Sequence, residues 1–253
     1  MNGRTAVVTG AGRGIGLAIA HALGAEGITV LLAARSPDEV RMEASKLRAR
    51  SIMAHAAVCD VTDEESVKAL AREAEAKLGH VDILVNNAGV SSSAPLRKLS
   101  LDEWNRVMAV NATGVFLCTR EFAPAMAERG WGRVITIAST SGLEGGRYIA
   151  HYCASKHAAV GFTRAAALEL EDRGVTVNAI CPAYVDTPMT ERTLETVGQK
   201  TGLARDAALR AVLETAGQER LIRPEEVAAE VVRLCRDDAS ETGQAIVLNG
   251  RSG

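Results

Sequence analysis

The sequence has few aromatic residues, little net charge and no long hydrophobic run. Phe, Trp and Tyr make up 3% of its 253 residues, and the basic and acidic residues nearly cancel, leaving a net charge of −2. This balance gives no overall attraction to nucleic acid or to an anionic membrane. No run approaches the roughly 18 apolar residues of a membrane-spanning helix, and the first residues lack the charged and apolar regions of a signal peptide. We therefore expect no membrane span and no nucleic-acid partner.

Cysteine is also scarce. The 5 cysteines form no CxxC pair and no cluster with metal-ligand spacing, and their odd number argues against a disulfide framework. We expect no bound metal and a reduced, cytoplasmic compartment. The residues concerned are Cys59, Cys118, Cys153, Cys181 and Cys235.

What the chain does contain is a regular alternation of apolar runs and helical patterns. The apolar runs are continuous rather than alternating with polar residues, which is typical of parallel strands buried on both faces. The sequence predicts an α/β fold: one doubly wound Rossmann domain over residues 1–253, with about seven parallel strands and helices on both faces. The expected strands are Ala6–Val8, Thr29–Leu32, Ala54–Val58, Val81–Val85, Val134–Ala138, Val175–Cys181 and Ala245–Leu248.

Capping signals place most of the helices between these strands. Thr62 with Glu65 and Ser100 with Glu103 have the spacing of capping boxes. The expected helices are Ile15–Ala25, one opening at Ser36–Pro37, Thr62–Leu78, Ser100–Met126, Tyr152–Asp172 and one opening at Pro224. A mixed helical segment at about 187–218 interrupts the alternation, and we interpret it as a substrate lid or as a plain surface helix pair.

A glycine-rich loop joins the first strand to the first helix. Its glycines permit a tight turn and close approach of the backbone to a pyrophosphate, which the helix N-terminus attracts. The spacing is TGxxxGxG rather than the GxGxxG of many dinucleotide folds. A purely structural turn is the alternative. The loop residues expected to bind the cofactor are Gly10, Arg13, Gly14, Ile15 and Gly16.

The end of the second strand indicates which dinucleotide this is. A fold that prefers the unphosphorylated ribose needs a carboxylate there, but the sequence has no acid before Asp38. Arg35 instead offers a guanidinium that can grip a 2′-phosphate, and Arg13 is a second cation. The sequence therefore favours NADP(H), although both arginines could also be solvated surface residues.

The stretch around Tyr152 carries the candidate chemistry. Tyr152 and Lys156 lie one turn apart on a helix, and the ammonium group is expected to lower the pKa of the phenol from about 10. Such a tyrosine can donate or accept a proton near neutral pH. Ser139 could hydrogen-bond the same substrate oxygen, with Thr140 and Ser141 as competitors.

Taken together, the motifs resemble the short-chain dehydrogenase/reductase family over nearly the whole chain. The resemblance implies a Rossmann fold, a nicotinamide beside the catalytic group, and assembly into homotetramers or homodimers. The matching residues are Thr9-Gly10 with Gly14 and Gly16, Asp60, Asn86-Asn87-Ala88-Gly89, Asn111, Ser139, Tyr152 with Lys156, and Pro182 with Thr187.

The resemblance also implies a role for each matching residue. Tyr152 would be the general acid in reduction, Lys156 would bind the nicotinamide ribose, Ser139 would polarise the substrate oxygen, and Asn111 would position a water beside Lys156. The cofactor contacts would be Asp60 and Val61 at the adenine, Asn87, Ala88 and Gly89 along the central strand, and Pro182, Val185 and Thr187 near the nicotinamide. Ala183 replaces the usual glycine after Pro182, which predicts a local shift of that loop.

The substrate is less closely defined. The motifs look most like those of ketoreductases acting on 3-oxoacyl thioesters or polyketide chains, with Leu143 to Tyr148 as one wall of an apolar pocket. Such a pocket would also suit cyclic, aromatic or steroid ketones. The alternatives are an NAD-dependent secondary-alcohol or 3-hydroxyacyl dehydrogenase and, more remotely, a non-catalytic protein that senses NADP.

Overall fold

The computed structural model describes residues 1 and 3–250. Seven strands form one sheet in the order β3-β2-β1-β4-β5-β6-β7, and every neighbouring pair is parallel. The predicted doubly wound parallel sheet is thereby confirmed. The strand order reverses between β1 and β4, where folds of this kind open a crevice at the carboxyl ends of the strands. The strands are β1 (Thr5–Thr9), β2 (Thr29–Ala34), β3 (Ala54–Val58), β4 (Ile83–Asn86), β5 (Gly132–Ile137), β6 (Val175–Pro182) and β7 (Ala245–Leu248).

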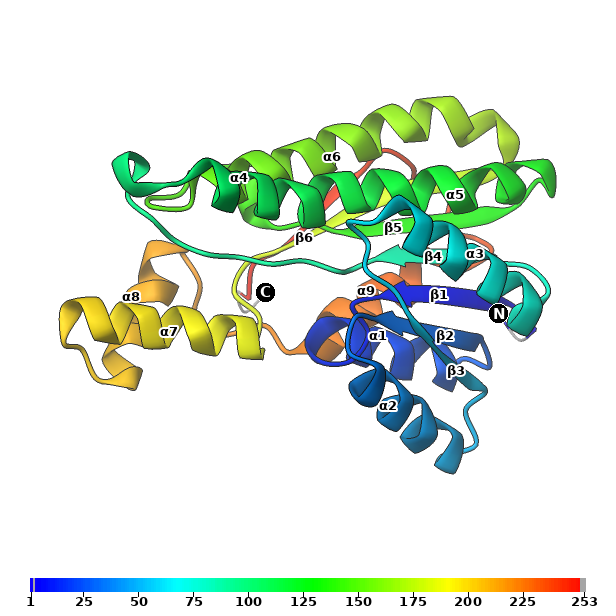
Figure 1. Cartoon of the computed structure of the whole chain (residues 1–253), viewed down its shortest axis with the longest axis horizontal. Helices are drawn as coiled ribbons and strands as arrows, with labels where there is room; N and C mark the ends of the chain where they lie inside the picture. The colour runs from blue at the N-terminus through cyan, green and yellow to red at the C-terminus, as the bar shows by residue number, and fades with distance from the viewer. Residues whose placement is uncertain (2, 251–253) are drawn as a thin grey trace.

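Helices cover both faces of the sheet (Figure 1). One layer consists of α1 (Gly14–Ala25), α2 (Pro37–Ala49) and α9 (Pro224–Leu234). The opposite layer consists of α3 (Glu64–Leu78), α4 (Leu101–Met108), α5 (Gly114–Glu128) and α6 (Ala150–Leu170).

The central strands explain why their sequences are continuously apolar. On β1, Ala6 and Val8 pack into the core beneath α1, α2 and α9, whereas Val7 between them packs into the core beneath α3 and α5. All three side chains are fully buried. Because successive side chains of a strand point to opposite faces, a sheet covered on both sides needs apolar residues at every position.

One predicted helix is broken. The segment expected as a single helix from Ser100 to Met126 consists of α4, a π-helical turn at Ala109–Thr113, and α5. Ser100 does cap α4, since its hydroxyl accepts the N–H of Glu103 at 3.2 Å. The wider turn carries Asn111 into the interior, where its side chain bonds to Val90 and Ser155. Such π-turns are frequent at functional sites.

Two other local predictions were wrong by a residue or two. The cap of α3 is Asp63, whose carboxylate accepts the N–H of Glu65 at 3.0 Å, while Thr62 donates to Asp60. Strand β4 begins at Ile83 rather than at Val81.

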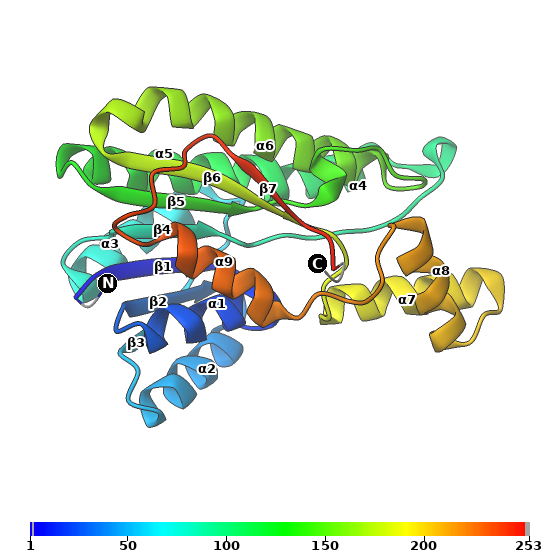
Figure 2. The same cartoon turned by 180° about the vertical axis from the view of Figure 1, so that it is seen from behind.

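The segment expected at about 187–218 forms two helices, α7 (Pro188–Thr201) and α8 (Arg205–Thr215). They pack on each other through Leu194, Ala208 and Val212, and they project beyond the carboxyl ends of the strands (Figure 2). Among the described residues, no helix is long and apolar enough to cross a membrane.

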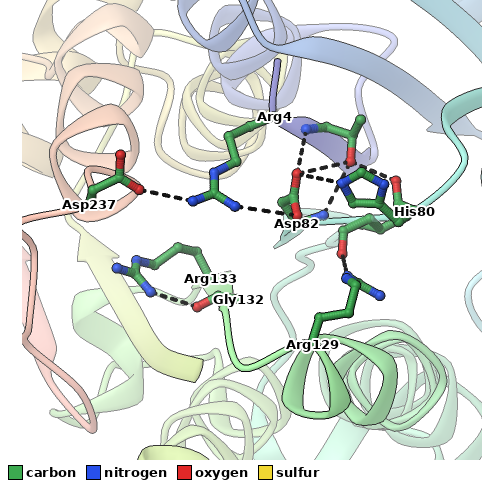
Figure 3. A network of polar contacts seen from close by, with 9 residues as sticks. Arg4, His80, Asp82, Arg129, Gly132, Arg133 and Asp237 are labelled. Atoms are coloured by element: carbon green, nitrogen blue, oxygen red, sulfur yellow. Dashed lines mark hydrogen bonds and ion pairs between the residues drawn. The ribbon is translucent and has the colours of Figure 1, made fainter. Parts of the chain in front are cut away.

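A polar network ties the opposite, amino-terminal edge of the sheet together (Figure 3). Arg4 reaches Asp82 at 3.7 Å and Asp237 at 3.1 Å, and its guanidinium lies 3.6 Å from the centre of the Trp131 ring. The buried carboxylate of Asp82 also accepts the backbone N–H of Thr5 at 3.0 Å. These contacts join the ends of β1 and β4 to the chain after α9, far from the crevice, so their role is structural.

Candidate active site

A cavity of about 330 Å³ lies at the carboxyl ends of the strands. It is walled by the glycine-rich loop, by the residues after β2, β3 and β4, and by α6 and the first turn of α7. The predicted site residues that line it are Gly10, Arg13, Gly14, Ile15, Arg35, Asp60, Val61, Asn87, Ala88, Gly89, Tyr152, Lys156 and Thr187. Segments from most of the chain therefore converge on one site.

The glycine-rich loop is held in place by Asn87. The side-chain amide of Asn87 donates to the carbonyls of Thr9 at 2.9 Å and Gly10 at 3.1 Å. A Cβ on Gly10, where φ is +64°, would lie 2.8 Å from Cα of Ala88. Gly16 lies behind the loop and does not line the cavity, but a Cβ there would clash with the Asn87 amide. The glycines therefore let loop, helix and strand approach closely.

The start of α1 suits a bound pyrophosphate. The first turn of this helix contains no acidic residue, so no carboxylate offsets the positive end of the helix dipole. Thr187, at the start of α7, faces the same loop, with its Cγ2 3.6 Å from the Cβ position of Gly14. The loop, the helix end and the cavity fit a dinucleotide.

At the far end of the cavity, Arg35 lies near Asp60. Burial alone would raise the pKa of Asp60, but hydrogen bonds from the backbone and hydroxyl of Thr62 and the charge of Arg35 lower it below its usual value. The carboxylate is thus bonded to its own loop. Ser36 and Glu39, at the start of α2, also line the cavity, and neither was predicted as a site residue.

Two residues predicted near the nicotinamide lie outside the lining of the cavity. Pro182 and Val185 do not line the cavity, and the carbonyl of Val185 accepts the hydroxyls of Thr187 at 3.3 Å and Thr190 at 2.5 Å. Val185 therefore anchors the first turn of α7. Ala183 is not among the described residues with positive φ, and its N–H bonds to the carbonyl of Leu248 at 2.9 Å, so the backbone accommodates alanine there. The local shift of the loop stays a prediction.

Tyr152 and Lys156 meet at the other end of the cavity, one turn apart on α6. The Nζ atom of Lys156 donates to the carbonyl of Ile137 at 2.8 Å and lies 5.9 Å from the centre of the Tyr152 ring. Burial lowers the pKa of Lys156 to about 8 and raises the pKa of Tyr152 to about 12, the latter against a hydrogen bond with Ser139. The expected lowering of the phenol pKa by Lys156 is therefore wrong for this structure, because desolvation dominates and the ammonium group faces Ile137.

Ser139 is the hydroxyl that meets the phenol. It is 8% exposed, its hydroxyl accepts the N–H of Ser141 at 3.1 Å, and it hydrogen-bonds to Tyr152. Leu143 packs instead beside Ala138 and Val160, and the side chain of Tyr148 is 62% exposed. Neither Leu143 nor Tyr148 lines the cavity, so the predicted substrate wall lies outside it.

Asn111 lies behind this group and is fully buried. Its amide accepts the N–H of Val90 at 2.9 Å and donates to the carbonyl of Val90 at 2.9 Å and to the hydroxyl of Ser155 at 3.0 Å. The Cβ position of Gly89 lies 3.5 Å from its Oδ1 and 3.6 Å from Nζ of Lys156. Asn111 thus fixes the strand extension beside Lys156, and its role toward a water stays a prediction.

A second polar cluster adjoins Tyr152 and was not foreseen. The hydroxyl of Ser92 donates to Glu103 and lies 2.7 Å from Nε2 of His151, which is fully buried. Hydrogen bonds from Arg106 and Ser92 lower the pKa of Glu103 to about 2. The ionised carboxylate has no proton to donate and can only accept hydrogen bonds. Because Ser92 has one proton and gives it to Glu103, Nε2 of His151 must carry a hydrogen. The complete burial of His151 fits a packing role.

Replacing Ser92 with alanine should destabilise the fold. His151 already has a buried Nδ1 without a partner among the described residues, and the substitution would leave its Nε2–H unpaired as well. We expect the free energy of unfolding to fall by about 1–3 kcal/mol, measured by urea denaturation. Ser93→Ala, at the exposed neighbouring position, is the control. Equal stabilities of the two variants would contradict this account.

The comparisons with known proteins agree with this geometry. Residues 4–217 match the model of the short chain dehydrogenase family. The chain belongs to this family. It is 39% identical over 251 residues to a protein of Streptomyces coelicolor named "Putative ketoacyl reductase", with 98% of this chain and 96% of the relative covered. It is 36% identical over 247 residues to the D-beta-hydroxybutyrate dehydrogenase of Cupriavidus necator, with 97% and 96% covered.

One solved structure has the same sequence identity to this chain as that first relative. A single-residue variant of actinorhodin polyketide ketoreductase, crystallised with NADPH, has a TM-score of 0.93 at 39% identity, covering 98% of this chain and 96% of that one. This short-chain dehydrogenase is thus an oxidoreductase that acts on CH–OH and C=O groups with NADP(H). Among residues 1 and 3–250, no three His, Cys, Asp or Glu side chains are grouped to hold a metal ion.

Proposed function

We propose that the protein is an NADPH-dependent ketoreductase that reduces a 3-oxoacyl chain, as a thioester or a polyketide. The protonated phenol at the end of the cofactor cavity carries this proposal. Tyr152 lines the cofactor cavity and is hydrogen-bonded to Ser139, so its hydroxyl is placed to give a proton to a carbonyl oxygen. Reduction of a ketone needs such a proton donor.

The chain's own residues then have distinct tasks. NADPH, when bound, supplies the hydride that the carbonyl carbon receives. Ser139 and Tyr152, which hydrogen-bond to each other, are placed to hold the carbonyl oxygen as negative charge builds on it, and the Tyr152 proton neutralises that oxygen to give the alcohol. Lys156 would hold the nicotinamide ribose, and Asn111 keeps the backbone beside it in place.

The names of the relatives support the acyl substrate. Ketoacyl reductase, polyketide ketoreductase and beta-hydroxybutyrate dehydrogenase all name an oxygen function on an acyl chain. Met189 of α7 lines the cavity, which favours α7 and α8 as a lid that covers an apolar chain. Leu143 and Tyr148 would contact only the outer part of such a chain.

One alternative is an NAD-dependent dehydrogenase running in the oxidative direction. The similarity to the hydroxybutyrate dehydrogenase favours this alternative, while Arg35 in the cavity favours NADPH. A non-catalytic NADP sensor would not need the Ser139–Tyr152 pair.

We also propose that copies of the chain assemble into a homotetramer or a homodimer in the cytoplasm. Phe116 on α5 and Leu168 on α6 are 39% and 74% exposed, and these helices form the outer surface of one layer (Figure 1). A second copy packed there would cover both side chains. All five cysteines are free, as expected in a reducing compartment.

The test is NADPH oxidation measured with acetoacetyl thioesters, cyclic diketones, aryl ketones and steroid ketones, with NADH in parallel. We expect the highest kcat/KM for the thioesters with NADPH. A preference for NADH with hydroxyacyl substrates would support the alternative, and NADPH binding without oxidation of any ketone would indicate the sensor.

A further inference from the structure

Charged side chains of both signs line the cofactor cavity. Arg13 and Arg35 are the cations expected to bind a 2′-phosphate, and Glu39 and Asp60 line the same cavity. Lys156 and Arg192 also line the cavity, so positive side chains outnumber the two carboxylates. The cavity as a whole therefore attracts phosphate, and each carboxylate opposes that attraction locally.

Glu39 occupies a defined position in this site. It belongs to the first turn of α2, where the helix dipole favours a carboxylate. Its Oε1 lies 3.4 Å from Nη1 of Arg13, and its Oε2 lies 3.1 Å from the Cβ position of Gly12. The carboxylate thus lies over the glycine-rich loop, beside the guanidinium that is expected to contact the phosphate.

The Arg13–Glu39 pair is open to solvent. The side chains are 61% and 41% exposed, so the ion pair itself contributes little to stability. The carboxylate matters for ligand binding instead. A 2′-phosphate bound at Arg13 would bring a charge of about −1.5 to −2 close to the Glu39 carboxylate. The free 2′-hydroxyl of NAD(H) is neutral and can donate a hydrogen bond to a carboxylate.

We propose that Glu39 sets how strongly this protein prefers NADP(H) over NAD(H), by opposing the 2′-phosphate and competing with it for Arg13. Arg13 and Arg35 attract the phosphate, and Glu39 limits that attraction to a moderate level. The inference concerns cofactor binding alone and does not depend on which ketone is reduced.

Equilibrium binding of NADP⁺ and NAD⁺ to Glu39→Gln, measured by titration calorimetry at low salt, tests the proposal. Removal of one carboxylate charge a few ångströms from the phosphate should tighten NADP⁺ binding by about five- to tenfold. Binding of NAD⁺ should stay unchanged or weaken. The gain should shrink in about 0.5 M salt, since exposed charges are then screened.

Two further variants separate charge from structure. Glu230→Gln removes a carboxylate that pairs with Arg233 on α9, outside the cavity, and should leave both affinities unchanged. Glu39→Asp keeps the charge and should bind NADP⁺ far less tightly than Glu39→Gln does. The proposal is overturned if Glu39→Gln changes the affinities for NADP⁺ and NAD⁺ by the same factor, or if it weakens NADP⁺ binding. It is also overturned if Glu39→Asp gains as much NADP⁺ affinity as Glu39→Gln does.

Discussion

Replacing Tyr152 with phenylalanine is expected to lower kcat for ketone reduction by about 10²–10⁴-fold, the usual contribution of a positioned proton donor. The phenyl ring retains the shape of the side chain in the cavity, but it has no proton to give to the developing alkoxide. Affinity for NADPH should change little, because many other residues line the cofactor cavity. Steady-state NADPH oxidation and a separate fluorescence titration of NADPH measure the two effects.

Tyr148→Phe provides the matched control for this experiment. Tyr148 loses the same hydroxyl, but its side chain is 62% exposed and does not line the cavity. We expect its kcat to stay near that of the unmodified protein. If Tyr152→Phe lost NADPH affinity in step with activity, Tyr152 would be a cofactor-binding residue and not the acid.

Gly16→Ala is expected to weaken cofactor binding although Gly16 does not line the cavity. The added methyl group would clash with the amide nitrogen of Asn87 and would lie 2.5 Å from the carbonyl oxygen of Gly10. A backbone oxygen cannot move away as a flexible side chain can, so α1 must shift or the bonds from Asn87 to the loop must break. Overpacking of this kind costs about 1–3 kcal/mol, equivalent to a rise of about 5- to 150-fold in the dissociation constant if the strain falls on the loop.

Calorimetric titration with NADP⁺ measures the part of that free energy lost from cofactor binding, and urea denaturation measures the part lost from the stability of the fold. Gly161→Ala on α6 is the control, because a Cβ there meets nothing within 4 Å. Alanine in an open helical position should be neutral or stabilising. Unchanged NADP⁺ affinity and unchanged stability of Gly16→Ala would show that the loop has more room than the structure indicates.

The sequence alone determined the parallel sheet and the cofactor class, and it singled out the candidate catalytic pair. Each depends on local order along the chain: apolar runs of strand length, glycines at fixed spacing after the first strand, and a tyrosine one helical turn before a lysine. Such features survive in any correct fold, because neighbours in sequence remain neighbours in space.

Only the tertiary structure decided the contacts between distant segments. Ser92 and His151 are 59 residues apart, Asn111 and Val90 are 21 apart, and Arg13 and Glu39 are 26 apart. No periodic pattern indicates which of these side chains will meet. The pKa of Tyr152 was misjudged for the same reason, since desolvation depends on everything packed around the phenol and not on one neighbour along the helix.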